Sequence, residues 1–297
     1  SGDDQDAQVT QSGEDNRASV TQEGRDHEAV VQQSGNANTA TVTQSGHDNA
    51  AVVEQGGHRN RAVIGQSNHD NKSAVRQGGS RNEAYVTQVG HNNRRADVTQ
   101  DGDDNVAYIT QLSSRNEASI SQSGDGNLGM VWQSGGDGNE ASINQVGNRG
   151  YARIIQGGSN NRASQQQGGD DNLSDLYQLG NNNRASSSQG GWYNYAGVAQ
   201  IGNANRAEVD QGGNNNFASL NQTGSGNRYD VDQSGNNNSI FSDETRMPAF
   251  QLGNDNEARI IQSGNDNSLF IQQIGNGNMI MSVQSGSGNV ATITQMP

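Results

Sequence analysis

Apolar and polar residues alternate in short stretches that recur along the chain at a fixed distance. Gln33 to Gln55 contains the unit twice: Gln, two residues to Gly, three more to Asn, then Ala, Val and Gln at alternate places. Alternation with a period of two, with β-branched residues at the apolar places, predicts a strand. Gly and Asn tolerate positive φ and predict a tight turn before it. Each unit of eleven residues is therefore predicted to form one strand and one turn.

The repeat extends over the whole sequence. Frame glutamines run from Gln11 to Gln295, and 22 of their 25 intervals are eleven residues, two are twelve and one is eighteen. With the opening segment this makes 26 units. An internal repeat of this regularity decides the architecture before any other feature does.

Alternate units differ, so the structural repeat is predicted to be 22 residues. The place after Asn holds Arg in one set of units and a large apolar residue in the other; these are Arg162, Arg184, Arg206 and Arg228 against Tyr151, Leu173, Tyr195 and Phe217. One strand and one turn cannot close a coil, whereas two of each can. The sequence thus predicts an all-β fold: a β-solenoid of about 13 two-strand coils with two unlike faces, stacking end to end into a cross-β amyloid fibril.

Within each strand, Asn, Ala, Val and Gln are predicted to face inward and the residues between them to face solvent. A buried amide without a partner costs on the order of 1–3 kcal/mol, but amides stacked above identical amides satisfy one another. The predicted structural ladder contains Gln11, Gln22, Gln33, Gln44, Gln55, Gln200 and Gln211 together with Asn16, Asn38, Asn49, Asn60 and Asn205. The predicted turn glycines include Gly13, Gly24, Gly35 and Gly46.

Residues 1–297 are predicted to form a single solenoid with few irregularities. The eighteen-residue interval contains an insertion at 243–249, which is expected to bulge out as a loop because Pro248 cannot donate to a central ladder. Phe250 is expected to resume the frame. Single added residues near Arg94 and near Gly135 are expected to be absorbed in turns.

Composition narrows the class of protein further. Hydrophobic residues make up 29% of the chain, against roughly 45–50% in globular proteins, so the totals alone suggest a disordered segment rich in Gln and Asn. The regular spacing overturns that reading. There is no Cys, which excludes disulfides and thiol chemistry. No cofactor is implied.

Charge argues against several partners. The net charge is −14 and the sequence shows no basic cluster, which disfavours nucleic acid and polybasic membrane contacts. No apolar run approaches the roughly 20 residues of a membrane span, so membrane insertion is not expected. Glu208 and Asp230 are expected to offset the charges of Arg206 and Arg228 on the outward face.

The motif Gln-x-Gly-x-x-Asn-x-Ala-x-x-x-Gln, read at Gln11–Gln22, Gln33–Gln44 and Gln200–Gln211, resembles the curlin repeat of the major curli fibre subunits. The resemblance covers essentially the whole chain. It implies a bacterial, extracellular amyloid subunit that is exported unfolded through a dedicated outer-membrane secretion pore with accessory factors. It further implies nucleation at the cell surface by a minor subunit and polymerisation into biofilm matrix fibres that support cell adhesion. The family's structural roles carry over to the Gln, Asn and Gly positions given above.

The chain departs from the curlin pattern in two ways. Curlins usually have Gly directly before the Asn, and this chain keeps it at Gly126, Gly226, Gly277 and Gly288 and mostly has Asp or Asn elsewhere. It also has more repeats than familiar members and is expected to lack their non-repeat amino-terminal segment. No signal peptide is visible and the repeat begins at residue 1, so any export segment is expected to have been removed or left out.

The end units are expected to make the chain an open-ended homopolymer. A soluble solenoid needs atypical end repeats, whereas both end units here keep the inward residues of the interior ones. These filament-end residues are Gly2, Ala7, Val9, Asn289, Ala291, Ile293 and Gln295. Unpaired strands at both ends would template the next molecule, and a head-to-tail contact that does not close gives a filament.

A soluble or surface-displayed β-solenoid that binds a ligand, ice or calcium is the alternative. Ice binding requires a continuous Thr array, but Thr41 with Thr43 and Thr292 with Thr294 are isolated pairs. Calcium solenoids use a nine-residue period rather than eleven.

Candidate chemistry is sparse. His47, His69 and His91 share the third place after Gln in alternate units, so they are expected to stack in a column. One hypothesis is that this column binds a metal ion. The preferred interpretation is a solvated turn. We therefore assign no metal site. Carboxylates such as Asp103-Asp104 and Asp170-Asp171 occupy predicted turns without a pocket, so an enzyme is not expected. Trp132, Trp192 and Tyr193 are predicted to face outward or to lie in turns.

Overall fold

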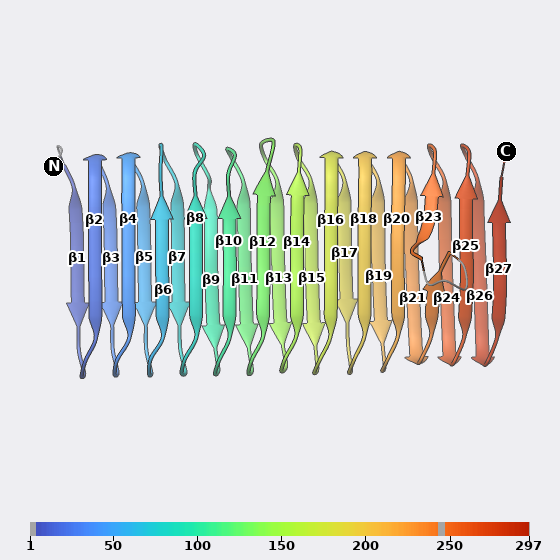
Figure 1. Cartoon of the computed structure of the whole chain (residues 1–297), viewed down its shortest axis with the longest axis horizontal. Coiled ribbons are helices and arrows are strands. Elements are labelled where there is room, and N and C mark those ends of the chain that lie inside the picture. The colour runs from blue at the N-terminus through green and yellow to red at the C-terminus, as the bar shows by residue number, and fades with distance from the viewer. Residues whose placement is uncertain (1–3, 243–246, 297) are drawn as a thin grey trace. The chain divides into compact units, whose positions relative to one another are not determined.

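The computed structural model describes residues 4–242 and 247–296. Contacts divide the chain into two compact units, Ser1–Arg149 and Gly150–Pro297, which we call unit 1 and unit 2 and describe separately. Every regular element among the described residues is a β-strand. In Figure 1, the strands of each unit stand side by side and are joined by tight turns at both ends. The prediction of a single solenoid over residues 1–297 stays a prediction.

Unit 1 contains two parallel sheets built from alternate strands. Its sheet A has the order β1 (Asp6–Gln11), β3 (Glu28–Gln33), β5 (Ala50–Gln55), β7 (Lys72–Gln77), β9 (Arg95–Asp101), β11 (Glu117–Ser123) and β13 (Glu140–Val146). Its sheet B has the order β2 (Arg17–Arg25), β4 (Thr39–His47), β6 (Arg61–Gln66), β8 (Glu83–Gln88), β10 (Val106–Gln111) and β12 (Leu128–Ser134).

Unit 2 repeats this arrangement. Its sheet A has the order β15 (Arg162–Gly168), β17 (Arg184–Gln189), β19 (Arg206–Gly212), β21 (Arg228–Asn236), β24 (Glu257–Asn265) and β26 (Met279–Ser287). Its sheet B contains β14 (Tyr151–Gly157), β16 (Leu173–Asn181), β18 (Tyr195–Asn203), β20 (Phe217–Ser225), β22 (Ser239–Phe241), β23 (Ala249–Leu252), β25 (Ser268–Ile274) and β27 (Val290–Gln295). The predicted all-β class, the β-solenoid and the total of about 13 two-strand turns are confirmed.

The register between neighbouring strands follows the 22-residue repeat. Gln22 pairs with Gln44 across β2 and β4, and Gln33 pairs with Gln55 across β3 and β5. Parallel strands normally need a long crossover connection. Here the intervening strand of the other sheet is that crossover, which is why one eleven-residue unit cannot fold without the next.

The core is a thin layer between the two sheets. Burial alternates along the strands, and the Ala and Val places of interior coils are almost fully buried. The Ala place of sheet B packs against the Val place of sheet A: a Cβ added at Gly129 would lie 2.9 Å from Ile120 Cγ2. Gln165 and Ser174 show the same facing, with a hydrogen bond of 2.9 Å from Gln165 Nε2 to Ser174 Oγ.

The outer surface of sheet A is mainly polar and charged. Arg206 lies 3.0 Å from Glu208, and Arg228 lies 3.6 Å from Asp230, as expected from their spacing. Arg76 pairs with Glu54 of the neighbouring strand at 3.0 Å. These side chains are about half exposed, so each pair contributes little to stability. Their main effect is to offset columns of like charge.

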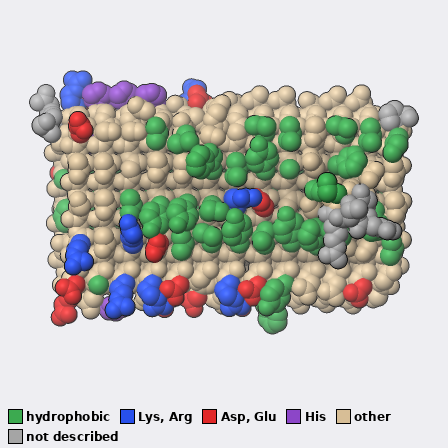
Figure 2. Space-filling view, in the orientation of Figure 1, with side chains coloured by type: hydrophobic (Ala, Val, Ile, Leu, Met, Phe, Trp, Pro, Cys, Tyr) green, Lys and Arg blue, Asp and Glu red, His purple; other side chains and the backbone are tan. Residues whose placement is uncertain are grey.

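The outer surface of sheet B is more apolar in each unit. Stacked rings run along it, with centroids 5.0 Å apart for Tyr85 and Tyr108 in unit 1 and 4.6 Å apart for Tyr195 and Phe217 in unit 2. Exposed apolar side chains on this surface include Val89, Leu112, Trp132, Leu173, Tyr177, Leu179, Ile201 and Leu252. Figure 2 shows rows of hydrophobic groups on this face. The two predicted unlike faces are therefore a polar one and an apolar one.

The insertion splits one strand of sheet B into β22 and β23. Ala249 already pairs with Leu220 of β20, so the strand resumes one residue earlier than the predicted loop boundary at 243–249. Residues 243–246 of that loop lie outside the described residues. The added residue near Arg94 is absorbed before β9, where the register becomes 23 residues, as in the pairing of Ala74 with Asp97.

Core substitutions accompany this split. Tyr229 occupies the Ala place of β21 and is fully buried, while the strand of sheet B that follows has Ile240 at its Ala place and Ala249 at its Val place. The Tyr229 hydroxyl finds no hydrogen-bond partner among the described residues. Burial raises the pKa of Tyr229 far above its ordinary value.

Tyr229→Phe is expected to stabilise the fold by about 1–3 kcal/mol, because it removes a buried hydroxyl without a partner and keeps the ring. The measurement is equilibrium unfolding in guanidinium chloride followed by circular dichroism. Tyr108→Phe, at an exposed ring on sheet B, is the control and should leave the midpoint unchanged. Lower stability for Tyr229→Phe would show that the hydroxyl has a partner.

Candidate functional site

The inward glutamines of unit 1 form two continuous hydrogen-bonded ladders. Each Gln Nε2 donates to the Oε1 of the Gln one coil later, at 2.8 Å from Gln33 to Gln55 and 2.9 Å from Gln22 to Gln44. The ladder of sheet A contains Gln11, Gln33, Gln55, Gln77, Gln100, Gln122 and Gln145. That of sheet B contains Gln22, Gln44, Gln66, Gln88, Gln111 and Gln133. All of these bonds run in the same direction along the unit.

The same amide also joins the two sheets. Gln33 Nε2 donates to the Arg17 carbonyl of β2 at 3.0 Å, and Gln55 Nε2 donates to the Thr39 carbonyl of β4 at 3.1 Å. One hydrogen of each amide is thus used along the ladder and another across the core. A register slip of one residue would turn these amides to the outer face and break both sets of bonds.

Unit 2 carries the same ladders through its irregular strand. Gln200 donates to Gln222 at 2.8 Å, and Gln211 donates to Gln233 at 2.8 Å. Gln222 then reaches Gln251 at 2.8 Å although 29 residues separate them. The ladder therefore continues in register past the insertion.

The asparagines hold the turns. The Asn38 N–H donates to Asn16 Oδ1 at 3.0 Å, and the Asn60 N–H donates to Asn38 Oδ1 at 3.0 Å. Asn38 Nδ2 donates back to the Ser34 carbonyl at 2.9 Å, which closes the turn. Asn205 repeats this role with Asn183 in unit 2. His27 stands at one Asn place and takes over the acceptor role, since the Asn49 N–H lies 3.3 Å from His27 Nδ1.

The turn glycines stack directly on one another. Gly13, Gly24, Gly35 and Gly46 have φ values of 92°, 125°, 87° and 102°. A Cβ at Gly35 would lie 2.2 Å from the carbonyl oxygen of Gly57. Glycine is thus required here for both its conformation and its lack of a side chain.

A second left-handed position lies directly before the Asn. Asp15 and Asp48 have φ of 56° there, as expected for residues that tolerate this region, but Ala37, Arg59 and Tyr193 also have φ between 56° and 59°. Sequence reasoning assigned turn-forming residues to this place and did not foresee residues of the other kinds. The signal was the departure from the curlin pattern, in which this place is Gly.

The strands at the two chain ends are partly uncovered. Among the described residues, β1 pairs only with β3 and β27 only with β25. Val9 is 46% exposed, whereas the stacked Val31 is fully buried. Ala7 is also exposed, and Ala291, Ile293, Gln295 and the preceding Asn289 are exposed or half-exposed. Gly2 lies outside the described residues.

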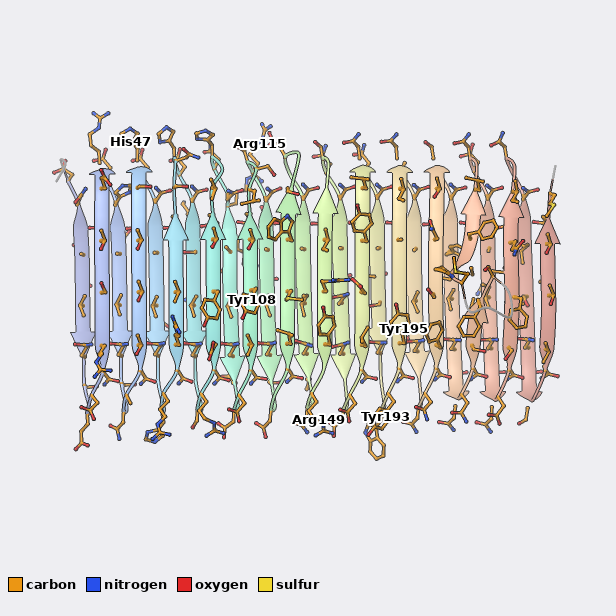
Figure 3. The ribbon with its side chains drawn as sticks, in the orientation of Figure 1. His47, Tyr108, Arg115, Arg149, Tyr193 and Tyr195 are labelled. Atoms are coloured by element: carbon orange, nitrogen blue, oxygen red, sulfur yellow. The ribbon has the colours of Figure 1, made fainter. Side chains whose placement is uncertain are left out.

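The histidine column exists but does not converge on a point. His47 and His69 stack with ring centroids 4.7 Å apart, and His69 and His91 follow at 5.1 Å, along the turn edge where Figure 3 labels His47. No group of three His, Cys, Asp or Glu side chains in the described part of the chain is placed to hold a metal ion. The metal hypothesis thus gains no support from geometry.

The other polar candidates lie on the surface. Asp103 and Asp104 lie in a turn beside Arg81, whose hydrogen bond holds the pKa of Asp104 below its ordinary value. Trp132 and Tyr193 are exposed, on a strand and in a turn respectively. No helix in the part of the chain described here is long and apolar enough to cross a membrane.

Comparison with known families gives one match. The family model described as Curlin associated repeat matches residues 2–35, 35–67, 114–147, 180–213 and 249–275. Together these segments cover more than half of the chain. No curated protein matches the sequence.

Gln33→Leu is expected to cost about 1–3 kcal/mol for each buried group that it leaves unpaired, among them Gln55 Oε1. Gln32→Leu makes the same chemical change at the neighbouring, outward place of β3 and is the control. Denaturant unfolding measures both. Equal midpoints for the two variants would contradict a structural role for the ladder.

Gly202→Ala is expected to destabilise the protein by about 3 kcal/mol or more, because φ is 120° and the added Cβ would lie 2.0 Å from the Gly224 carbonyl oxygen. Gly212→Ala is the matched control, since a Cβ there has no neighbour within 4 Å. Thermal unfolding followed by circular dichroism should separate the two. A tolerated Gly202→Ala would refute the close approach of stacked turns.

Proposed function

The chain belongs to the curlin-repeat family, and from that premise we propose that it is the structural subunit of an extracellular, curli-like amyloid fibre. The fold and the family are structural rather than catalytic. In this proposal the protein assembles with itself, in the biofilm matrix of a bacterial cell, and the fibre supports adhesion.

The observation that carries the proposal is the in-register amide ladder. Among the described residues, inward Gln and Asn side chains bond repeatedly to the identical groups of the coils before and after them, as Gln33 does with Gln11 and Gln55. A further coil added at an exposed edge would obtain the same bonds. The ladder therefore supports assembly by the interaction that holds each unit together.

The edge strands supply a place for that addition. β1 and β2 at one chain end, and β26 and β27 at the other, each have one side without a strand partner among the described residues. Covering Val9 and the half-exposed Ile293 would bury apolar area at roughly 25 cal/mol per Å². Unpaired strand edges are the usual template for strand addition between chains.

The charge of the chain bears on when assembly occurs. A net charge of −14 makes copies repel one another, and the repulsion is screened within about 8 Å at physiological salt. This favours slow association in dilute solution. Slow association is compatible with the further partners that the family resemblance suggests. These are a minor nucleating subunit, and an outer-membrane secretion pore with accessory factors that deliver the chain to the cell surface.

The purified protein is expected to form unbranched filaments with cross-β diffraction at about 4.7–4.8 Å and 10 Å. Electron microscopy and fibre diffraction provide the measurement, and added salt should speed the assembly. A persistently monomeric protein without these reflections would overturn the proposal in favour of a soluble binding solenoid.

Two variants of β1 sharpen the test of the edge. Val9→Lys places a charge where the added coil would bury it, so filament elongation should slow strongly while the free protein keeps its fold, because Val9 is 46% exposed there. Thr10→Lys adds the same charge at the next, outward place of β1 and should slow elongation far less. Equal effects would show that β1 is not the growing edge.

A further inference from the structure

An open cavity lies on unit 1 where the extra residue near Arg94 disturbs the repeat. Between β5 and β7 the strand pairing starts at the residue after Asn, with Ala50 opposite Lys72. Between β7 and β9 it starts two residues later, with Ala74 opposite Asp97. A cavity of about 320 Å³ occurs beside this gap, and its walls are Asp70, Lys72, Asn92, Arg94 and Arg115. Its volume is in the lower range of small-ligand sites.

Three of these five side chains are cationic, in a chain with 18 basic and 32 acidic residues. The sequence shows no basic cluster because Lys72, Arg94 and Arg115 are more than 20 residues apart. Stacking of successive coils brings them together. The fold thus brings together three cations that composition and the linear sequence pattern do not reveal.

The cations are available to a ligand. Lys72 is the single lysine of the sequence, and it forms no ion pair with another described residue. Arg94 Nη1 lies 3.6 Å from Glu117 Oε1, and Arg115 Nη2 lies 2.6 Å from Asp137 Oδ2. Both pairs are exposed and therefore weak, so a bound anion can compete for the guanidinium groups. Figure 3 shows Arg115 projecting at the turn edge of unit 1.

The other two lining residues, Asp70 and Asn92, disfavour an anion that has no hydroxyl groups. The Asp70 carboxylate repels a compact dianion such as phosphate, but it accepts hydrogen bonds from hydroxyl groups. The Asn92 amide both donates and accepts. Asp70 and Asn92 occupy stacked turns, with the Asn92 N–H donating to the His69 carbonyl at 2.9 Å and the Asp70 N–H to the His47 carbonyl at 3.1 Å. Their backbones are therefore held in place before any ligand arrives.

We propose that this cavity binds an acidic sugar unit, of the hexuronate class. The sugar carboxylate lies against Lys72, Arg94 and Arg115, and the ring hydroxyls bond to Asp70 and Asn92. The sugar offers one carboxylate and several hydroxyl groups. The cavity offers three cations for the carboxylate, and a carboxylate and an amide for the hydroxyl groups. The site goes beyond the proposed function and does not depend on it, because it lies on a turn edge away from the strand edges.

The test uses the single lysine as a reporter. The full chain is acetylated with an amine-reactive reagent, and the rate at Lys72 is followed by peptide mass spectrometry with glucuronate, glucose or inorganic phosphate present. Glucuronate at ten times its Kd should slow the reaction at Lys72 about tenfold. Glucose should leave the rate unchanged, and phosphate should protect less than glucuronate.

Variants identify the site. Arg94→Gln should weaken the protection by glucuronate, and Arg115→Gln should do the same. Arg184→Gln is the matched control. Arg184 follows Asn183 as Lys72 follows Asn71, and the substitution removes one positive charge from unit 2 instead of unit 1. It should leave the protection intact. Circular dichroism of each variant verifies the fold.

Several results would overturn the inference: no protection by glucuronate, equal protection by glucose, or protection by phosphate as strong as that by glucuronate. Full protection in Arg94→Gln and Arg115→Gln would also overturn it. Since the cavity is exposed on a turn edge, the measurement applies to the free chain and to any assembled form, and its outcome is separate from that of the filament test.

Discussion

The structure depends on one constraint: a buried side-chain amide must find another amide one coil away. The core is thin, so the inward polar side chains must be satisfied within it. When Gln stacks on Gln and Asn on Asn, each amide obtains its hydrogen bonds from the neighbouring coils. The apolar places are less constrained. Gln165 and Ser187 replace Val, and Tyr229 replaces Ala, without disturbing the strand register. The apolar places thus vary more than the ladder, in which His27 replaces an Asn but keeps its role as acceptor.

The 22-residue period gives the two outer faces separate identities. Because residues of one kind stack in columns, a face accumulates either like charges or like rings. Sheet A offsets its charges with short-range pairs such as Arg76 with Glu54, while sheet B uses contacts between neighbouring rings such as Tyr195 and Phe217. A single eleven-residue period would have mixed these residues on both faces. The doubling therefore decides which surface is polar and which is apolar.

Much of the fold could be predicted from the sequence, because strict spacing reports directly on the ladder. The alternation of Asn, Ala, Val and Gln fixed the strands and the buried face, and the Arg and Tyr series gave the two-strand coil. The positive φ of Ala37 and Arg59 was not predicted, since these residue types disfavour it and only the Gly of the curlin pattern at this place signals it.

The candidate sites were less accessible to sequence reasoning. The Gln and Asn ladder positions follow from periodicity alone. The second bond of each Gln, across the core to a carbonyl such as that of Arg17, requires coordinates. So does the meeting of Lys72, Arg94 and Arg115, which are distant in sequence and lie where the repeat is irregular. The repeat predicts least where an added residue shifts the strand pairing, as it does near Arg94.

Within each unit the glutamine bonds all run the same way, which gives the unit a direction. In unit 1 the ladders begin at Gln11 and Gln22, whose side-chain oxygens receive no hydrogen bond from a described residue. In unit 2 the last ladder bonds reach Gln284 and Gln295, whose side-chain nitrogens donate to no other glutamine among the described residues. The edge of unit 1 at Gln11 and Gln22 thus presents amide oxygens without donors, and the edge of unit 2 at Gln284 and Gln295 presents amide nitrogens without glutamine acceptors. A copy turned end for end would set oxygen against oxygen. The side-chain amides therefore define an orientation. A neighbour added in the inverted orientation could not form the amide-to-amide bonds that hold each coil in place.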